Sequence, residues 1–195
     1  MKILIVVANA GEKSFNHAIA DAAKGAMLAK GHEVILHDLY KEKFNPVLAA
    51  LEISERSPSD KVVKKHCEEL AGADGIIIIH PNWWGQPPAM LKGWVDRVIR
   101  QGVAYKFVEN DKGEGVPVGL LKAKTALVFN TSNTPQKREE EEFGDPLETL
   151  WKKCIFGLCQ IKNVYRKNYG VIVISTPEQR KEWLEDVKKT VSKFF

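Results

Sequence analysis

Apolar residues along the chain gather in two kinds of stretch, short continuous runs and longer segments with helical spacing. The short runs are typical of strands that are covered on both faces of a sheet. They lie at Lys2–Ala8, Glu33–Asp38, Gly75–His80, Ala126–Asn130 and Val171–Ser175. The last run is the latter half of a longer stretch, 164–175, in which we place the fifth predicted strand.

Segments with helical spacing separate these strands. They are predicted at Phe15–Lys30, Ser57–Ala71, Ala89–Arg100 and Leu147–Leu158, and from Thr176 towards the end of the chain. Ser57 with Pro58, and Thr176 with Pro177, each supply an N-cap followed by a first-turn proline. The alternation predicts a single α/β domain over residues 1–195, with a parallel sheet of five strands and helices on both faces.

Two stretches between these elements lack a long periodic pattern. Val103–Pro117 contains several glycines and a proline, and it is interpreted as a lid or a hairpin. The acidic run Glu139–Glu142, beside Lys137 and Arg138, is interpreted as the solvated surface of a loop or helix.

Composition excludes several classes of protein. With 44% hydrophobic and 28% charged residues, the chain is globular rather than disordered. Its 29 basic and 25 acidic residues give a net charge of +4 without the basic block of a nucleic-acid binder. No apolar run reaches membrane-spanning length, and the chain enters a strand without a signal-peptide pattern. Three cysteines, interpreted as buried apolar side chains, indicate a cytoplasmic protein; they are Cys67, Cys154 and Cys159.

Ligands of an open parallel sheet bind outside the carboxyl ends of the strands. The loops that follow the predicted strands there are 9–16, 81–88 and 131–145. The first leads into a helix N-terminus, whose free N–H groups attract a phosphate, and Ser14 and Asn16 add polar side chains. It matches neither the P-loop nor the three-glycine dinucleotide motif. A plain N-cap explains Ser14 equally well.

The second loop holds two adjacent tryptophans, Trp83 and Trp84. Neighbouring residues do not easily both face one core, so the pair indicates a flat aromatic ligand. A hydrophobic contact with a partner subunit is the alternative, and the two are compatible. The third loop opens with small polar residues, 131–135, which either approach the edge of a ring or form an ordinary turn.

The five histidines show no metal-ligand spacing with one another or with cysteine, so no metal site is predicted. Four of them are interpreted as residues of the surface or of the edge of the core, namely His17, His32, His37 and His66. His80 ends the third strand beside the ligand loops, and it is interpreted as a structural neighbour rather than a catalytic base.

Four regions carry a family resemblance: Lys13–Asn16, Asp38–Tyr40 with Phe44–Pro46, Trp83–Val98, and Phe143–Asp145 with Leu150–Trp151. The third is the most specific, because it runs Trp-Trp-Gly-Gln-Pro-Pro-Ala-Met-Leu-Lys-Gly-Trp-Val-Asp-Arg-Val. Together they resemble the NAD(P)H:quinone oxidoreductases over nearly the whole chain. The resemblance implies a flavodoxin-like fold, a tightly bound FAD or FMN, and a homodimer with its active site at the subunit interface.

The resemblance also implies roles for particular residues. Flavin contacts fall on three loops and one helix, at Asn9, Ser14, Phe15, Asn16, Pro81, Asn82, Trp83, Trp84, Asp96, Thr131, Ser132 and Asn133. The first loop would hold the phosphate side, the second would line the isoalloxazine ring, and the third would approach its pyrimidine edge. Tyr105 and Phe107, reached from the partner subunit, would wall the substrate pocket.

The chain departs from the best-known members of that family at three places. Asn9 stands where they have histidine, and Ser132-Asn133 stand where they have paired glycines. Lys137 and Phe143 occupy the positions of a tyrosine and a histidine over the ring. No catalytic side chain is therefore assigned, and Phe143 is placed with the walls of the substrate pocket.

The activity implied by the resemblance is hydride transfer from NAD(P)H, through the flavin, to quinones or similar flat acceptors. The two substrates share one slot, which gives ping-pong kinetics. A flavin, azo or nitro reductase is the alternative within enzymes. The alternatives outside are a flavodoxin-type electron carrier and a flavodoxin-like regulatory subunit that docks to a partner such as a membrane ion-efflux channel. FAD or FMN, NADH or NADPH, and the physiological acceptor are left open.

Overall fold

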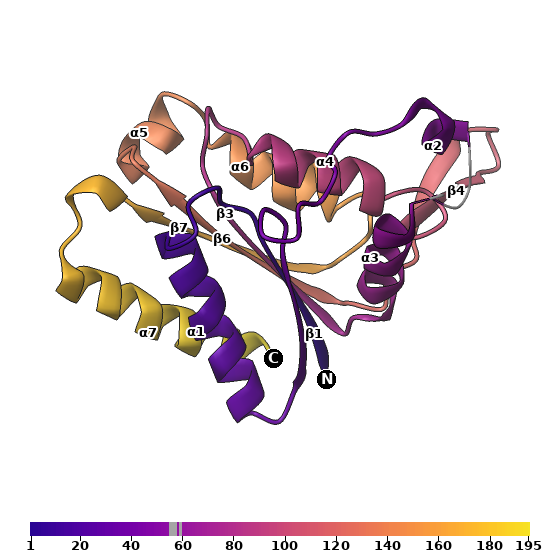
Figure 1. Ribbon diagram of the computed structural model, residues 1–195. Helices are drawn as coiled ribbons and strands as arrows, with labels where there is room; N and C mark the ends of the chain where they lie inside the picture. The colour runs from indigo at the N-terminus through magenta and orange to yellow at the C-terminus, as the bar shows by residue number, and fades with distance from the viewer. Residues whose placement is uncertain (55–57, 59) are drawn as a thin grey trace.

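The computed structural model describes residues 1–54, 58 and 60–195. Its central element is a parallel sheet (Figure 1) of five strands: β1 (Lys2–Val7), β2 (Glu33–Asp38), β3 (Gly75–Pro81), β6 (Thr125–Ser132) and β7 (Asn163–Gly170). Their order across the sheet is β2-β1-β3-β6-β7. The chain therefore winds outward from β1 in both directions, which confirms the flavodoxin-like arrangement expected from the sequence.

Helices cover both faces of this sheet (Figure 1). One layer consists of α1 (Phe15–Ala29) and α7 (Pro177–Phe194). The other consists of α3 (Lys61–Gly72), α4 (Ala89–Val98), α6 (Pro146–Thr149) and the π-helical segment η1 (Leu150–Ile155). Two further short helices are α2 (Ala50–Ser54) and α5 (Gln136–Glu141). Of the helices that the described residues form, none combines the length and the apolar character needed to span a membrane.

Strand β3 divides its side chains between the two layers, because successive residues of a strand point to opposite faces. Ile76 and Ile78 pack with the α3, α4 and η1 layer, whereas Ile77 and Ile79 pack with α1 and α7. All four side chains are fully buried. The continuous isoleucine run therefore marks the central strand of a sheet that is covered on both sides.

Helix α3 begins at Lys61 and not at Ser57–Pro58 as predicted. Its N-cap is Asp60, whose carboxylate accepts hydrogen bonds from the N–H groups of Val62 and Val63, at 2.8 and 3.4 Å. Because the carboxylate is negatively charged, the positive end of the helix dipole also stabilises it, an interaction that a neutral serine hydroxyl lacks. The predicted cap Ser57 lies outside the described residues.

The fifth strand is β7, so the prediction of a strand at Val171–Ser175 is wrong. β7 lies at the edge of the sheet, and most of its side chains are only half-buried. An edge strand does not need a continuous apolar run, and polar residues occupy its middle. The apolar residues that follow form a short 3₁₀ turn, η2 (Ile172–Ile174), in which Val173 and Ile174 are exposed.

The segment interpreted as a lid or a hairpin is a hairpin. β4 (Tyr105–Glu109) and β5 (Gly115–Gly119) pair antiparallel and form a two-stranded sheet of their own. Figure 1 places β4 on the side of the molecule that carries α2 and α3.

The segment before α2 packs closely on α4. A Cβ added to Gly93 of α4 would lie 2.2 Å from the carbonyl oxygen of Pro46, so only glycine fits there. Arg97, one turn further along α4, forms a buried two-pronged ion pair with Glu52 and donates to the carbonyl of Asn45. Two of the segments that carry the family resemblance therefore meet in space.

Two interpretations of single residues need correction. Cys67 and Cys159 are buried as expected, but Cys154 is exposed, because η1 turns Trp151 and Ile155 into the core and leaves Cys154 outside. In the acidic run, Glu139 is buried whereas its neighbours Glu140–Glu142 are exposed. The solvated-surface interpretation thus holds for three of its four residues.

Candidate functional site

The first and third predicted loops are tied together at the N-terminus of α1. Ser14 is the N-cap of this helix, and its Oγ accepts a hydrogen bond from the N–H of His17 at 3.4 Å. Oδ1 of the buried Asn16 accepts from Nδ2 of Asn9 (3.1 Å) and from Oγ1 of Thr131 (2.9 Å). The residues assigned to the phosphate side and to the pyrimidine edge therefore meet at the carboxyl ends of β1 and β6.

Asn16 leaves a buried donor without a protein acceptor. Its Nδ2 has no hydrogen-bond partner among the described residues. The orientation of the amide is determined, because Asn9 and Thr131 both donate to the opposite atom and Oδ1 of Asn9 is occupied by the N–H of Gly11. An unpaired buried donor costs about 1–3 kcal/mol. The loop thus favours a ligand that brings an acceptor.

The two tryptophans belong to a tight turn. The N–H groups of Trp83 and Gln86 each donate to the carbonyl of the other, at 3.0 Å. The central residues, Trp84 and Gly85, have φ angles of +57° and +70°, as in a type I′ turn. This backbone suits glycine and strains tryptophan. Because Trp84 is also fully exposed, neither packing nor backbone preference explains its side chain, whereas a ligand or partner that covers the ring does.

A buried carboxylate joins the second and third loops. Oε1 of Glu139 accepts hydrogen bonds from Nδ2 of Asn82 (2.9 Å) and from Oγ of Ser132 (3.1 Å). The N–H of Asn82 also donates to the carbonyl of Thr131 at 2.6 Å. Side-chain and backbone bonds therefore hold the two loops in a defined relative position.

A cavity of about 480 Å³ lies between these loops. Its walls include Asn82, Trp84, Glu139 and Phe143, and the guanidinium of Arg138 lies over the Phe143 ring, 5.4 Å from its centroid. The volume falls in the range of small-molecule sites, and the walls combine exposed aromatic rings with a few fixed polar groups. The arrangement suits a flat ring with a polar edge.

His80 lies beneath this site and uses both ring nitrogens within the protein. Nε1 of Trp151 donates to its Nε2 at 2.9 Å, so Nδ1 carries the hydrogen and donates to the carbonyl of Pro81 at 2.8 Å. Complete burial lowers the pKa of His80 to about 4. A neutral, fully bonded imidazole supports the interpretation of His80 as a structural residue.

Three other predicted flavin residues support the loops rather than line the cavity. Pro81 is buried. Phe15 lies with its ring 5.8 Å from that of Trp183 on α7. Asn133 is exposed, and its Oδ1 accepts from the N–H of Val173 at 3.0 Å.

The remaining predicted residues do not line this cavity within one chain. Asp96 is exposed on α4 and pairs with Lys92 at 2.5 Å. Tyr105 and Phe107 pack edge to face on β4, with centroids 5.6 Å apart. Lys137 is exposed on α5. Of the pocket residues expected from the resemblance, Phe143 alone reaches the described walls of this cavity.

A second cavity, of about 1040 Å³, lies at the carboxyl ends of β1 and β2. Its walls include His17 and Asp38, whose side chains are joined from Nε2 to Oδ2 at 3.1 Å. Nδ1 of His17 lies 2.8 Å from Oγ of Ser14. The sequence interpretation of His17 as a residue of the surface or of the edge of the core did not include this chain of contacts. Its one available signal was the three-residue spacing from the N-cap Ser14.

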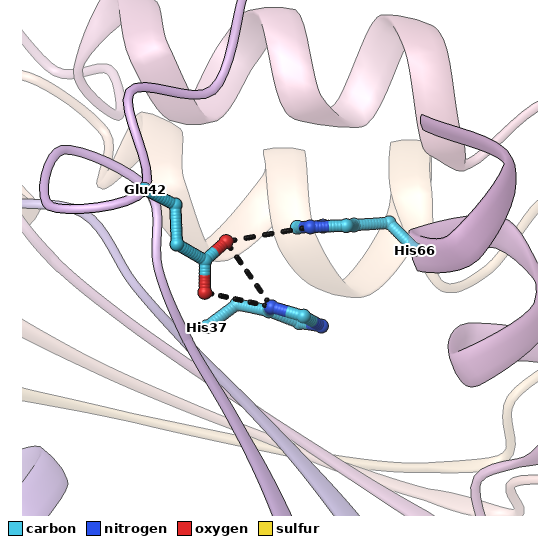
Figure 2. A group of neighbouring side chains, drawn as sticks. All are labelled: His37, Glu42 and His66. Carbon is cyan, nitrogen blue, oxygen red and sulfur yellow. Dashed lines mark hydrogen bonds and ion pairs between the residues drawn. The ribbon is translucent and has the colours of Figure 1, made fainter. Parts of the chain in front are cut away.

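The interpretation of His37 and His66 as residues of the surface or core edge is also wrong, since both are almost fully buried. Figure 2 shows Glu42 reaching both imidazoles, which lie one above the other with centroids 3.7 Å apart. Nδ1 of His37 lies 2.9 Å from Glu42, its Nε2 lies 2.7 Å from Glu69, and Nε2 of His66 lies 3.4 Å from Glu42.

Three potential ligand atoms of this cluster, from His37, Glu42 and His66, lie within 4.8 Å of one another. A coordinated cation lies close to the plane of each imidazole that binds it, and two rings stacked 3.7 Å apart and inclined by only 22° offer no such point between them. Nε1 of Trp94 also donates to Nδ1 of His66, so Nε2 carries the hydrogen and has no lone pair to offer. The geometry therefore favours hydrogen bonds from His37 and His66 to the carboxylate of Glu42 over coordination of a metal ion.

A family model described as flavodoxin-like fold matches residues 1–191. The chain is 33% identical to an uncharacterized NAD(P)H oxidoreductase of Haemophilus influenzae, over 95% of this chain and 91% of that protein. It is 31% identical to an FMN-dependent NADH:quinone oxidoreductase of Clostridium perfringens, over 83% and 81%. A solved NAD(P)H:quinone oxidoreductase of Methanothermobacter marburgensis has a TM-score of 0.80 and 26% identity, over 98% and 95%.

Proposed function

The chain belongs to the flavodoxin-like fold family, and from that premise we propose that it is a flavin-dependent oxidoreductase that transfers hydride from NAD(P)H to quinones or similar flat acceptors. The names of its relatives and of its structural neighbour support this activity. We also propose that residues 1–195 act as one flavin-binding domain. The overall reaction consumes NAD(P)H, one proton and the quinone, and yields NAD(P)⁺ and the hydroquinone.

The observation that carries the proposal is the unpaired donor of Asn16 in the loop that enters α1. The first turn of a helix offers N–H groups without helical acceptors, and the dipole attracts negative charge. Ser14 and Asn16 stand at that position. The residues present therefore fit the phosphate of a flavin. FAD and FMN share the ring and the first phosphate, so the geometry accommodates both.

The cavity between the second and third loops supports the placement of the flavin ring. Trp84 and Phe143 provide flat apolar surface, and Asn82 provides polar atoms, held in position by its hydrogen bond to Glu139. A bound flavin would supply the redox chemistry, accepting hydride from NAD(P)H and delivering it to the second substrate in a separate half-reaction. The protein's part is to hold the ring with one face open and to fix donors at its edge.

The proposed assembly is a homodimer in which each chain completes the pocket of the other. Large apolar side chains are exposed on α2 and on the hairpin, namely Leu51, Ile53, Phe107, Val108 and Val116. Exposed apolar patches of this kind mark contacts between proteins. A second copy would cover them and bring Tyr105 and Phe107 to the flavin face. Asp96 is assigned by resemblance to the same shared site.

The free thiols of Cys67, Cys154 and Cys159 support a reducing compartment, and we propose that the protein works in the cytoplasm.

The experiment that tests the proposed function starts from the purified protein. We expect the absorbance spectrum of a flavin, one per chain, and the mass of the released ligand identifies FAD or FMN. Turnover of NADH and NADPH is then measured with quinone, azo and nitro acceptors. Flavin without turnover would favour the regulatory alternative, and the absence of flavin from protein supplied with both FMN and FAD would contradict the proposal.

A further inference from the structure

Two groups of one residue, His17, contact the hydroxyl of Ser14 and limit the hydrogen bonds that it can donate. Its Oγ accepts the N–H of His17 at 3.4 Å and lies 2.8 Å from Nδ1 of the same residue. Nε2 of His17 lies 3.1 Å from Oδ2 of Asp38, whose other oxygen accepts the N–H of Lys41 at 3.2 Å. Hydroxyl, imidazole and carboxylate thus form a continuous chain from the N-terminus of α1 to the end of β2.

The direction of each hydrogen bond follows from the chemistry of the groups. A carboxylate only accepts, so Nε2 of His17 must carry a hydrogen and donate it to Asp38. In a neutral imidazole the other nitrogen then has only a lone pair. Nδ1 therefore accepts, and the hydroxyl of Ser14 donates to it. In this state Ser14 has no hydrogen left for an anion placed at the end of the helix.

We propose that the protein takes up one proton at Nδ1 of His17 when the phosphate of the flavin binds at the N-terminus of α1. This inference rests on the proposed function and deepens it. With a hydrogen on Nδ1, the imidazolium donates to Oγ of Ser14, and the hydroxyl is free to turn its own hydrogen towards the phosphate. His17 is thus a positioning residue, which acts on the cofactor through Ser14.

The charges around His17 agree with an uptake that depends on the phosphate. Asp38 and an arriving phosphate both stabilise an imidazolium. The other ionisable side chains of the surrounding cavity are mixed in sign, with Glu12, Asp21 and Glu42 opposed by Lys13, Lys41 and Lys43. Because the formal charges of these six side chains cancel, a bound phosphate would add net negative charge beside His17, which favours the imidazolium.

Isothermal titration of flavin-free protein with FMN tests the proposal directly. Repeating the titration in buffers of different ionisation enthalpy gives the number of protons taken up. The titration is carried out at pH 8, above the ordinary pKa values of histidine and of a phosphate monoester. We expect the wild type to take up about one proton more per FMN than His17→Asn, which keeps a polar atom beside Ser14 but does not titrate. The matched control His32→Asn, at the far end of α1, should behave as wild type.

Two further measurements test the proposal on the wild-type protein, without the His17→Asn variant. Riboflavin has the same ring without phosphate, and its binding to the wild type should take up no proton. In the unaltered flavin-loaded protein, the ¹⁵N chemical shift of His17 Nδ1 should be that of a protonated nitrogen, and in the flavin-free protein at the same pH that of an unprotonated one. Equal proton uptake by wild type and His17→Asn, with FMN bound tighter than riboflavin, would overturn the inference and leave the proposed function intact. Protein that binds neither FMN nor FAD would overturn both.

Discussion

Nδ2 of Asn82 lies 2.9 Å from Oε1 of Glu139, although 57 positions separate the two residues along the chain. The same oxygen accepts from Ser132. The buried carboxylate of Glu139 thereby sets the relative position of the two loops that border the smaller of the two cavities, the one of about 480 Å³. Those loops carry most of the residues assigned to the flavin ring.

Replacing Glu139 should therefore loosen the site and lower stability. Glu139→Ala leaves the half-buried amide of Asn82 and the buried hydroxyl of Ser132 without this acceptor, which costs about 1–3 kcal/mol in the free energy of unfolding. Urea denaturation measures that loss. Glu142→Ala is the matched control, because Glu142 lies on the exposed side of the same segment and pairs with Arg138 at the surface. Equal stability of Glu139→Ala and Glu142→Ala would contradict the structural role of Glu139.

Replacing Trp84 should raise the free energy of unfolding and weaken the binding of flavin. Its φ of +57° disfavours tryptophan, whereas Asn followed by Gly is the preferred pair of a type I′ turn. Trp84→Asn should raise the free energy of unfolding by about 1 kcal/mol. The same change removes an aromatic surface worth about 0.5–1.5 kcal/mol, so flavin should dissociate more readily. Trp83→Asn, outside the left-handed positions, should give no gain in stability. A destabilised Trp84→Asn would show that Trp84 packs within the chain.

The contacts of His37 with Glu42 and Glu69 should make the free energy of unfolding depend on pH. Burial disfavours the charged imidazole, but the hydrogen bonds and charges of Glu42 and Glu69 outweigh it and raise the pKa of His37 above 6.5. This contribution is complete below pH 6.5 and is lost as the pH rises through the raised value. Urea unfolding between pH 6 and 9 should show a steeper fall for the wild type than for His37→Gln. Parallel curves would contradict the ion pair.

Glu42, the carboxylate between His37 and His66, should give the opposite pH dependence, with stability lost as the pH falls. Although burial opposes ionisation, the hydrogen bonds and charges of His37 and His66 lower the pKa of Glu42 from 4.5 to about 2. Its contribution is complete above pH 4.5 and is lost as the pH falls towards 2. Glu42→Gln should therefore lose less stability than the wild type between pH 5 and 3 in the same urea titration. Equal losses over that interval would rule out this role of Glu42.

Assembly is tested by the mass of the particle in solution. One chain has a mass of 21.9 kDa, and light scattering at micromolar concentration should give about twice that mass. Leu51→Asp combined with Phe107→Asp places charge on the exposed apolar patch and should shift the protein towards the monomer. Leu28→Asp alters a similarly exposed side chain on α1, in the opposite layer, and should remain dimeric. A monomer with full turnover would exclude a shared site.

The sequence predicted those parts of the fold that depend on neighbouring residues. β1, β2, β3 and α1 were located to within one residue at each end, because buried runs and helical spacing are unambiguous there. The fifth strand was placed in the right stretch, 164–175, but in its latter half and not at β7, because the pattern of β7 is half polar and the apolar residues after it were more strand-like. The exposed tryptophan pair was likewise evident from the sequence, because two adjacent large rings in a Gly/Pro-rich loop do not fit one core.

Contacts between distant residues were beyond such reasoning. His17 meets Asp38 across 21 positions, and His37 meets Glu69 across 32. Each of these residues alone resembles an ordinary surface group, and only the parallel order of β1 and β2, with α3 packed beside them, brings them together. The burial of Glu139 within an acidic run is a further case, because its partners Asn82 and Ser132 lie on other loops.

Replacing Phe143 should change the binding of the acceptor without a large effect on the reduction of the flavin. Its ring lies at the wall of the smaller cavity, half-exposed and covered on one side by Arg138. A phenyl group donates no proton and no hydrogen bond, so it contributes surface and not acid–base chemistry. Phe143→Leu should raise the KM for the quinone several-fold, and Phe143→Tyr, which keeps the ring, should stay close to the wild type. In a ping-pong reaction, kcat/KM for NAD(P)H reports only the first half-reaction, and it should change by no more than a few-fold.

Stopped-flow mixing of the oxidised protein with NADH or NADPH measures that half-reaction directly. Each tenfold loss of rate would correspond to about 1.4 kcal/mol of barrier. A hundredfold slower reduction in Phe143→Leu, with the flavin still bound, would mean that residue 143 sets the geometry of hydride transfer. The ring would then act on the flavin or the nicotinamide, and the assignment of Phe143 to the acceptor wall would be wrong.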